Sequence, residues 1–512
     1  MRTRITSPVG SGNPEANKTG GTDYERIFNP KAIAIIGVSS EDGGAGFGSG
    51  ILLSLKVMGF NGKIYPVNPK GGTFAGLDIY KSVEDIPEEI DLAVIAVAAR
   101  FVPEVLEACR KKGAAGAEIL SSGFTEFTTQ EGTALEQEIK RIARSGIRVI
   151  GPNCFGIYCP KSGLTFLPNP DLSRETGPVA FLSQSGGMAS DFASTGKWMG
   201  IRFSKMISFG NGADLRETEL LQYLGDDPET QVIAMYAEGI EDGEGFFQAI
   251  KSVSREKPVI VYKGGLSMAG QRAVVSHTAS MGGSRVIWPS VLKQANAVQV
   301  FSMKEMAEAS LAFSFLPKKR FQGISVVGGG GALGVASCDA AESFGMEIPP
   351  FSPDLKTRIE TFLPKPGASG GNPIDVANPH VAPKALKEVL RLSAEDDRID
   401  LQVLISLLHH YKFRAKALGK PVAAVTPYRE LADAIREVMQ ATGKPVVLVL
   451  QNAKRGLEDL DVVEMLGHAR QVFLDHDIPV FDEILDAFRA IAHVNAYYGK
   501  RAKSMNGSLS VA

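Results

Sequence analysis

The sequence predicts an α/β protein built from doubly wound sheets, and three observations support this fold class. Short, near-continuous apolar runs recur along almost the whole chain, as expected of parallel strands that are buried on both faces. Helical patterns separate these runs, and several of them end in glycine, which commonly terminates a helix. The chain has 512 residues, enough for about two to four domains of ordinary size.

The first domain is predicted over residues 26–155. Residues 1–25 lack the apolar core of a signal peptide and are expected to form a disordered tail. Helices are predicted at "FVPEVLEACRKKG" and "ALEQEIKRIARSG", where apolar residues recur at helical spacing. The predicted strands are "AIAIIGV" (32–38), "KIYPVN" (63–68), "DLAVIAV" (91–97), "AEILSSG" (117–123) and "IRVIGPN" (147–153). Such alternation of strands and helices favours a parallel sheet with helices on both faces.

Two more α/β domains are predicted after the Pro/Gly-punctuated connector "PKSGLTFLPNPDLSRETG". One covers residues 170–317, with strands at "PVAFLSQ" (178–184), "FSKMISFG" (203–210), "VIAMYAEG" (232–239), "PVIVYKGG" (258–265) and "AVQVFS" (297–302). The other covers residues 320–500, opens at "GISVVGGGGALG" and has later strands at "LQVLISLL", "PVAAVTP", "PVVLVL" and "IPVF". Residues 501–512 are expected to be a loose tail.

Composition and charge exclude several classes of protein. The net charge of −2 argues against nucleic-acid binding, which needs a basic surface. No membrane helix is expected, because no uninterrupted apolar span of roughly 18 residues occurs. The four cysteines are too few and too scattered for a disulfide framework, which favours a reducing cytoplasm. No metal site is predicted, since Cys154 and Cys159 lack a second Cys/His pair at zinc-like spacing, and His409 and His410 are expected to be a strand-end or loop feature.

A glycine-rich loop, "GVSSEDGGAGFGSG" (37–50), follows the first predicted strand. Glycines such as Gly37 let backbone approach a ligand phosphate, and the N-terminus of the next helix favours negative charge. The spacing is not G-x-G-x-x-G, because Val38 and Ser39 follow the first glycine. Lys70 stands after the second strand, where dinucleotide-binding folds usually have an acidic ribose partner. A phosphate-bearing nucleotide is therefore favoured over a purely structural turn, with NADP and coenzyme A both open.

Two more polar turns follow predicted strands. The turn in "IGPNCFGI" (150–157) carries Asn153 and Cys154, and the turn in "FLSQSGGMASDFAS" (181–194) carries Ser183, Ser185, Gly186 and Gly187. The second turn opens a helix, so its hydroxyl and N–H groups are suited to bind an anion. An ordinary N-cap turn is the alternative. Since ligands in open α/β sheets bind beyond the carboxyl ends of strands, the two turns together favour an anion site.

His277 and Glu238 are the candidates for proton transfer or nucleophilic chemistry. His277 lies in "AVVSHTASMGGS" (273–284), interpreted as a small glycine-rich loop after a strand-like run. Imidazole titrates near neutral pH and can act as a nucleophile or a proton carrier, although a solvated loop histidine is the alternative. Glu238 ends the strand in "YAEGIEDGEGF", where a carboxylate can hold an imidazole through its N–H or simply cap the next turn.

These motifs form a long ordered series that resembles one known family. "FNPKAIAIIGVS", "GKIYPVNPKGG", "DLAVIAV", "VPEVLEAC", "GPNCFGI", "FLSQSGG", "GNGAD", "AEGIEDG" and "SHTASMGGS" occur in the order seen in the NDP-forming acyl-CoA synthetases. Within that family the chain is similar to the α subunits of ADP-forming acetate–CoA ligases, which are related to the succinyl-CoA synthetase α subunit. The resemblance covers about residues 28–500. It implies a Rossmann-like CoA-binding domain followed by two flavodoxin-like doubly wound domains, the first of which carries a phosphohistidine.

The resemblance also implies roles for individual residues. His277 would become phosphorylated, and Glu238 would orient it. The residues assigned to the CoA site are Gly37, Ser39, Lys70 and Val97. The residues assigned to the acyl-phosphate or phosphate site are Asn153, Cys154, Ser183, Ser185 and Gly186.

The implied reaction interconverts a carboxylic acid, CoA and ATP with acyl-CoA, ADP and phosphate through an acyl phosphate. The sequence contains no G-x-x-x-x-G-K-[ST] loop and no evident ATP-grasp domain. An ATP-grasp β subunit that holds ATP and Mg²⁺ is therefore expected as the partner in a hetero-oligomer. Two alternatives stay open: an acyl or carbamoyl transferase of the same superfamily, and a non-catalytic CoA-sensing protein. An NADP oxidoreductase is disfavoured, because two extra phosphate-handling domains follow the first.

Overall fold

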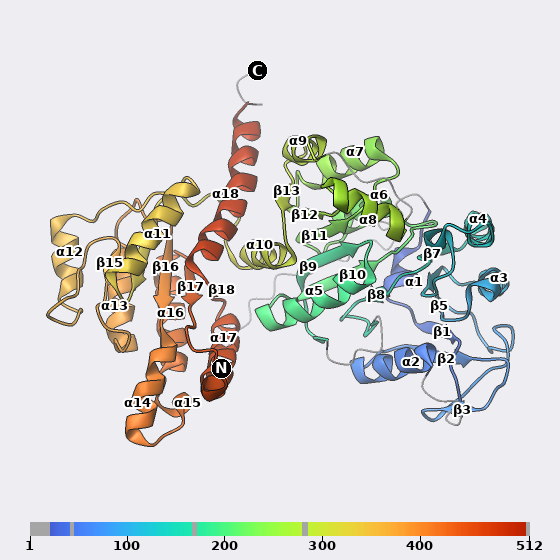
Figure 1. Ribbon diagram of the computed structural model, residues 1–512, viewed down its shortest axis with the longest axis horizontal. Coiled ribbons are helices and arrows are strands. Elements are labelled where there is room, and N and C mark those ends of the chain that lie inside the picture. Colours follow the sequence, from blue (N-terminus) through green and yellow to red (C-terminus); the bar gives the residue numbers. More distant parts are fainter. Residues whose placement is uncertain (1–20, 41–45, 166–171, 279–284, 508–512) are drawn as a thin grey trace, which may run out of the picture. The chain divides into compact units, whose positions relative to one another are not determined.

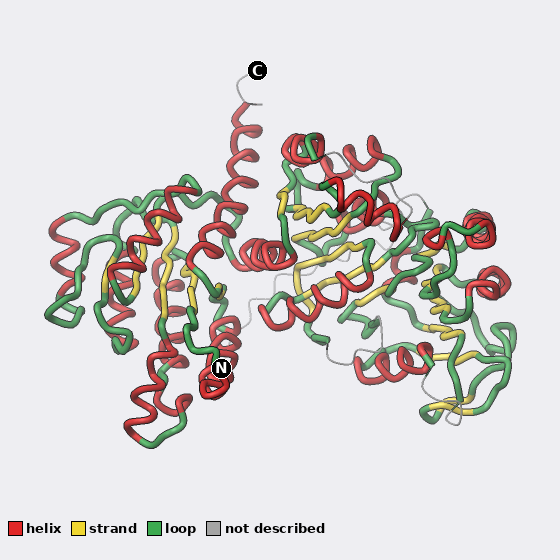
Figure 2. Tube along the Cα trace, in the orientation of Figure 1, coloured by secondary structure: helices red, strands yellow, loops and turns green. Residues whose placement is uncertain are grey.

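The computed structural model describes residues 21–40, 46–165, 172–278 and 285–507. It contains three sheets whose strands alternate with helices (Figures 1 and 2), so the predicted α/β fold class is confirmed. By its internal contacts the chain divides into two compact units, one that comprises residues up to 291 except 195–201 and 258–262, and one that comprises the rest. Each sheet is described by itself.

The first sheet has the strand order β2-β1-β5-β6-β7, and all its pairings are parallel. Its strands are β1 (Ala32–Ile36), β2 (Lys63–Val67), β5 (Leu92–Ile95), β6 (Gly116–Ile119) and β7 (Arg148–Ile150). The other elements are α1 (Tyr24–Phe28), α2 (Phe47–Met58), the hairpin of β3 (Thr73–Phe74) and β4 (Leu77–Asp78), η2 (Ala99–Phe101), α3 (Val102–Lys111), η3 (Thr125–Phe127) and α4 (Gln130–Ala143). Every residue of β1 and β5 is buried, which explains why their sequences are apolar without alternation.

The second sheet has the order β13-β12-β11-β9-β10-β8. Its strands are β8 (Gly156–Tyr158), β9 (Thr176–Ser183), β10 (Phe203–Ser208), β11 (Val232–Ala237), β12 (Val259–Lys263) and β13 (Val298–Val300). Its helices are α5 (Gly186–Met199), α6 (Glu217–Asp226), α7 (Gly243–Val253), α8 (Met268–Thr278), α9 (Ile287–Gln294) and α10 (Met303–Phe315). Strand β8 runs antiparallel to β10 and was not predicted, because three residues are too few for a periodic signal.

The third sheet has the order β15-β14-β16-β17-β18, with parallel pairings throughout. Its strands are β14 (Ile324–Gly328), β15 (Ile374–Asp375), β16 (Leu401–Ser406), β17 (Val446–Leu450) and β18 (Val480–Phe481). Its helices are α11 (Gly331–Ser343), α12 (Pro353–Glu360), α13 (Pro383–Ser393), η4 (Leu408–His410), α14 (Tyr411–Leu418), α15 (Val422–Val425), α16 (Tyr428–Thr442), η5 (Leu457–Asp459), α17 (Leu460–Asp475) and α18 (Ile484–Gly507).

All three sheets are wound in the same way. If the major strands of each sheet are numbered along the chain, with the antiparallel β8 set aside, their spatial order is 2-1-3-4-5. This order is flavodoxin-like, and the crevice that binds ligands in such sheets lies where the winding reverses, between the first and third strands. The reversal falls between β1 and β5, between β9 and β11, and between β14 and β16. The loops after these strands are therefore where a functional site is expected.

Three local predictions are wrong. The segment "PVAAVTP", predicted as a strand, contains the short helix α15, which packs against α14 and α17; four apolar residues cannot distinguish a buried strand from a helix. The N-terminal tail is shorter than predicted, because Asp23 caps α1 and the buried ring of Tyr24 stacks on Tyr223 at 4.1 Å. Residues 1–20 lie outside the described residues. The C-terminal tail also begins later, since α18 continues to Gly507.

Across the described residues, no helix combines the length and the apolar character that crossing a membrane would require.

Candidate functional site

The first reversal point carries the residues predicted to bind CoA. Gly37 follows β1 with φ +105°, and a Cβ there would lie 2.5 Å from the carbonyl oxygen of Ala96. Only glycine therefore lets the end of β1 lie against the end of β5. The loop is fastened by Ser39, whose backbone N–H donates to Ser49 Oγ at 2.9 Å, while the Ser49 hydroxyl donates to the Ser39 carbonyl at 3.2 Å.

A cavity of about 670 Å³ opens at this end of the first sheet. Its apolar lining includes Val67, which ends β2, and Val97, which follows β5. The lysines Lys81 and Lys111 also line it. Lys70 is exposed on the turn after β2, beside the lining residue Pro69. Glu84, Glu104 and Glu107 line it too. The cavity therefore combines an apolar wall with charges of both signs, and its apolar wall is suited to the apolar arm of a ligand.

A hydrogen-bond network joins the turn after β7 to the turn after β10. Asn153 has φ +55°; its N–H donates to the Ser121 carbonyl at 2.9 Å, and its Nδ2 donates to Asn211 Oδ1 at 3.3 Å. Asn211 Nδ2 in turn donates to Glu126 Oε2 at 2.7 Å. Asn211 lies in "GNGAD", but the motif alone does not single it out, because its partners come from distant parts of the chain.

The structure places Cys154 differently from its neighbour Asn153. Its side chain is buried, and Sγ donates to the Ile119 carbonyl at 3.4 Å. Burial also raises the pKa of the thiol far above its usual range. The thiol therefore points into the core of the first sheet, and the predicted place of Cys154 at the phosphate site stays a prediction that concerns its backbone and not its thiol.

A buried carboxyl group lies beneath the same turn. Glu118 on β6 is 3 % exposed, and a Cβ on Gly156 would lie 2.2 Å from Glu118 Oε2. Burial raises the pKa of Glu118 to about 8, because a desolvated carboxylate is unfavourable. Glu118 is therefore protonated at neutral pH and packs as a neutral group under the turn that holds Asn153.

Glu118→Gln is expected to change the pH dependence of stability. The folded chain keeps a proton on Glu118 that the unfolded chain releases between roughly pH 4 and 8, so the free energy of unfolding falls as pH rises through this window. Glutamine cannot ionise. The variant should match the wild type at pH 4 and be more stable by roughly 4–5 kcal/mol at pH 8, measured by urea unfolding at a series of pH values. Parallel curves for the two proteins would contradict the shift, and Glu131→Gln on the exposed side of α4 is the matched control.

The second reversal point brings the turn after β9 against the turn after β11. Ser185 Oγ accepts the N–H of Met188 at 3.3 Å and so caps α5, which begins at Gly186. Ser183 accepts the N–H of Ser185 at 3.1 Å and donates to its carbonyl at 2.7 Å. The first N–H groups of α5 follow this turn, and a helix N-terminus favours an anion. The anion site at "SQSGG" stays a prediction.

Gln184 connects this turn to Glu238, a role that was not predicted from the sequence. Gln184 Oε1 accepts the backbone N–H groups of Glu238 and Gly239, the latter at 2.9 Å. Its Nε2 donates to the Gly239 carbonyl at 2.9 Å. Because these bonds are made by backbone that follows the neighbouring strand β11, 55 residues along the chain, no local pattern could reveal them.

Glu238 lies directly after β11 and is 8 % exposed. Its Oε1 accepts a hydrogen bond from Tyr236 Oη at 3.0 Å. A buried carboxylate fixed by a hydroxyl is positioned to accept an N–H from a neighbouring ring rather than to sample solvent. The alternative interpretation of Glu238 as a cap of the next turn is wrong, since the cap of α7 is Asp242.

His277 lies in the last turn of α8 and not in a loop after a strand. The residues before it, interpreted as strand-like, form this helix, which packs beside η3. In so short a segment, two consecutive valines give the same apolar pattern as a buried strand. The His277 side chain and residues 279–284 lie outside what the structure describes, so the pairing with Glu238 stays a prediction.

Comparison with known proteins identifies the domains. Residues 31–160 match the CoA binding domain, residues 176–313 match the succinyl-CoA ligase like flavodoxin domain, and residues 324–504 match the ligase-CoA domain. The chain is 34 % identical over 488 residues to the α subunit of acetate–CoA ligase [ADP-forming] I from Pyrococcus furiosus, covering 94 % of this chain and 98 % of the relative.

A solved structure agrees with this match. The dinucleotide forming acetyl-coenzyme A synthetase 1 of Ca. Korarchaeum cryptofilum, in complex with phosphate and ADP, superposes with a TM-score of 0.79 at 32 % identity, over 96 % of this chain and 99 % of that one. The 4-hydroxybutyrate–CoA ligase [ADP-forming] of Nitrosopumilus maritimus is 31 % identical, over 91 % of this chain and 63 % of the relative.

The chain belongs to the NDP-forming acyl-CoA synthetases. The resemblance inferred from the sequence is thereby confirmed, as is the order of one CoA-binding domain and two further ligase domains. As an acyl-CoA synthetase the chain is a ligase that forms the bond between an acid and the thiol of CoA.

The third reversal point of this synthetase has a glycine-rich turn opposite a pair of histidines. The turn between β14 and α11 spans Gly328 to Gly331. His409 and His410 lie in η4, directly after β16, and their ring centroids are 4.4 Å apart. His409 Nδ1 bonds to the Gln451 carbonyl at 3.0 Å. The expectation of a strand-end feature is correct in position.

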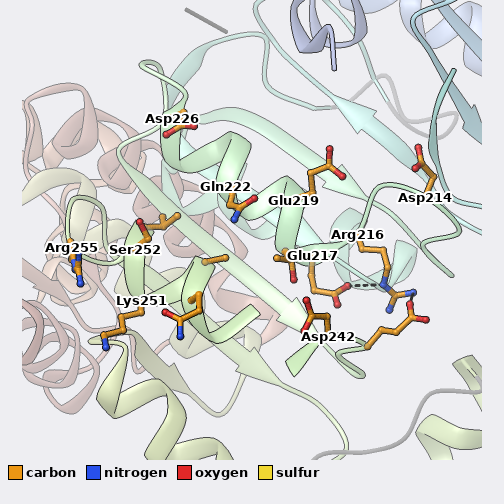
Figure 3. Close-up of a pocket in the computed structure, with 15 residues that line it drawn as sticks. Asp214, Arg216, Glu217, Glu219, Gln222, Asp226, Asp242, Lys251, Ser252 and Arg255 are labelled. Atoms are coloured by element: carbon orange, nitrogen blue, oxygen red, sulfur yellow. Dashed lines mark ion pairs between the residues drawn. The ribbon is translucent and has the colours of Figure 1, made fainter. Parts of the chain in front are cut away.

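A further cavity of the synthetase reaches the loops after β10 and β11, which contribute Asp214, Arg216, Glu241 and Asp242 to its lining. It measures about 1080 Å³ and runs along α6 and α7, which pack against each other (Figure 3). Several of its carboxylates bind arginines: Asp214 and Glu219 bind Arg148 at 2.8 and 2.7 Å, and Glu241 binds Arg216 at 3.0 Å. The size of this groove therefore does not indicate the reacting centre.

Proposed function

We propose that this chain is the CoA-binding, phosphohistidine-bearing subunit of a synthetase that interconverts a carboxylic acid, CoA and ATP with acyl-CoA, ADP and phosphate. Residues 26–155 would bind CoA, residues 170–317 would carry the phosphohistidine, and residues 320–500 would complete the ligase. The observation that carries the proposal is the second reversal point. There the capped N-terminus of α5 and the buried Glu238 lie side by side, joined by Gln184.

Phosphorylation supplies the leaving group that a carboxylate lacks. In the proposed sequence, a ring nitrogen of His277 attacks the γ-phosphorus of ATP and ADP leaves. The acid's carboxylate oxygen then attacks the phosphorus of phosphohistidine, which regenerates His277 and forms an acyl phosphate. Finally the CoA thiolate attacks the acyl carbon and phosphate leaves. The phosphohistidine and the acyl phosphate divide one difficult displacement at a carboxylate into easier steps.

Apart from Cys154, whose thiol points into the core, each predicted site residue has a part in this sequence of steps. Glu238 would accept the N–H of the His277 ring, which fixes the ring and favours its cationic phosphorylated form. Ser183, Ser185 and Gly186 would bind the phosphoryl oxygens through N–H groups at the start of α5. Asn153, held by Asn211, would complete that site, and Gly37, Ser39, Lys70 and Val97 would bind CoA.

A separate polypeptide would hold the nucleotide. Two relatives are named α subunits, and this chain covers 98 % and 89 % of them, but it covers 66 % and 63 % of two relatives whose names specify no subunit. We infer that the remaining function, binding of ATP and Mg²⁺, comes from an ATP-grasp β subunit in a cytoplasmic hetero-oligomer.

Phosphohistidine mapping tests the proposal. The chain, with and without its co-purified partner, is incubated with ³²P-phosphate and a panel of acyl-CoAs, and labelled peptides are mapped by mass spectrometry without acid. Label on the His277 peptide, dependent on acyl-CoA, is the expected result. Absence of label with every acyl-CoA, while CoA binding is intact and the partner present, would favour the transferase or the CoA-sensing alternative.

A further inference from the structure

Lys263 is a buried lysine to which the proposed reaction assigns no role. It ends β12 and is 4 % exposed. Its ammonium group donates to two backbone carbonyls, those of Glu238 and Gly264. The first of these belongs to the residue proposed to orient His277, and the second begins the connection from β12 to α8. Burying a lysine is costly, so a position filled only for packing would favour an apolar side chain.

The same ammonium group also contacts the far side of the histidine segment. Lys263 Nζ lies 5.2 Å from the centroid of the Trp288 ring, within the range of a cation–π interaction. Trp288 is in the first turn of α9. Residues 264 and 288 flank the segment that contains α8 and His277. One buried cation therefore holds both ends of that segment and the backbone of Glu238.

The charge of Lys263 is sensitive to pH near neutrality. Burial lowers its pKa to about 8, and the negative charge of Glu238 opposes this shift. At the end of β11, Lys263 faces the Glu238 carboxylate and the Tyr236 hydroxyl that is bonded to that carboxylate. On α9 it faces the uncharged indole of Trp288. In the connection from β12 to α8 it meets the backbone carbonyl of Gly264. Above pH 8 the ammonium becomes an amine and loses its charge-assisted hydrogen bonds and its cation–π contact.

We propose that Lys263 is a positioning residue for phosphoryl transfer, which holds Glu238 and both ends of the His277 segment through its ammonium group. The inference rests on the proposed function of His277. Lys263 touches backbone and an indole ring, so it acts through these groups and not on the phosphoryl group itself.

The first test compares the rate at which His277 is labelled from acyl-CoA and ³²P-phosphate. Lys263→Met, which keeps the length of the side chain, should label roughly 10- to 100-fold more slowly, as expected when a reacting group is misplaced by about 1 Å. Lys263→Arg should recover part of the rate. Lys251→Met is the matched control, because Lys251 lies 5.6 Å over the Phe247 ring of the same domain but bonds to no residue of the site. CoA binding should be equal in all variants.

The second test follows the titration of the Lys263 ammonium group in a protein that keeps this lysine, with Lys263→Arg as the comparison. The chain has two tryptophans, so in a Trp198→Phe background the fluorescence reports Trp288. The emission should titrate with a midpoint at about pH 8, and the labelling rate should fall over the same range. Lys263→Arg should show neither transition.

The outcomes separate the two proposals. An unlabelled wild-type chain would overturn the proposed function and, with it, the role of Lys263. A labelled wild type, with Lys263→Met labelled within about twofold, would overturn the inference alone. If Lys263→Met does not fold, the wild-type titration decides: the absence of a transition near pH 8 in Trp288 emission would overturn the inference, and coincident transitions in emission and labelling would support it.

Discussion

Replacing His277 with alanine is expected to abolish phosphoryl transfer. The proposed sequence passes the phosphoryl group through a ring nitrogen of His277, and alanine offers no nucleophile. Removing a nucleophile that forms a covalent intermediate typically lowers kcat by a factor on the order of 10⁴ or more. Turnover of acyl-CoA, ADP and phosphate by the chain with its partner should fall by at least about that factor, and the ³²P label on the peptide should disappear.

The control for this variant is His468→Ala, since His468 is an exposed histidine on α17. It should keep wild-type turnover. CoA binding, measured by calorimetry, should be unchanged in His277→Ala, because the cavity at the end of the first sheet is lined by residues 36–111. A variant that binds CoA and turns over normally would mean that the phosphoryl group travels by another route.

The positions of most strands along the chain could be predicted because local sequence determines them. β1 and β5 are buried at every position, so each reads as an unbroken apolar run. The long helices α3 and α4 show the helical spacing of apolar residues over several turns. Where a segment was short, the prediction failed. The four residues of α15, the three of β8 and the valines before His277 carry too little periodicity to choose a secondary structure.

The turns that carry the proposed site could be predicted from the sequence, but the hydrogen bonds that join them could not. Ser183 ends β9, Ser185 and Gly186 come after it, and Glu238 follows β11. The reversal of winding brings these two strand ends together. Gln184, Asn211 and Lys263 escaped notice because each acts on backbone or side chains of another strand. Their roles depend on tertiary contacts, which single-sequence patterns do not contain. For Cys154 the motif was visible in the sequence, but the motif does not show that the side chain points into the core.

Gly210→Ala is expected to disrupt the turn that holds Asn153. Gly210 has φ +55°, and a Cβ there would lie 2.2 Å from the carbonyl oxygen of Asn153 and 2.4 Å from that of Pro152. Backbone atoms cannot rotate away as a side chain can, so the two turns must separate. The left-handed conformation costs alanine roughly 1–2 kcal/mol, and overpacking adds about 1–3 kcal/mol. The free energy of unfolding in urea should therefore fall by about 2–5 kcal/mol.

Gly59→Ala separates these two costs. Gly59 ends α2 with φ +71°, and a Cβ there would meet no atom within 4 Å. This variant should lose only the conformational part, about 1–2 kcal/mol. Displacement of Asn153 should also slow labelling of His277 in Gly210→Ala, whereas Gly59→Ala should label at the wild-type rate. If both variants lose the same stability and label equally, the contact between the turns after β7 and β10 does not constrain the site, and Asn153 would then have to be held by Ser121 alone.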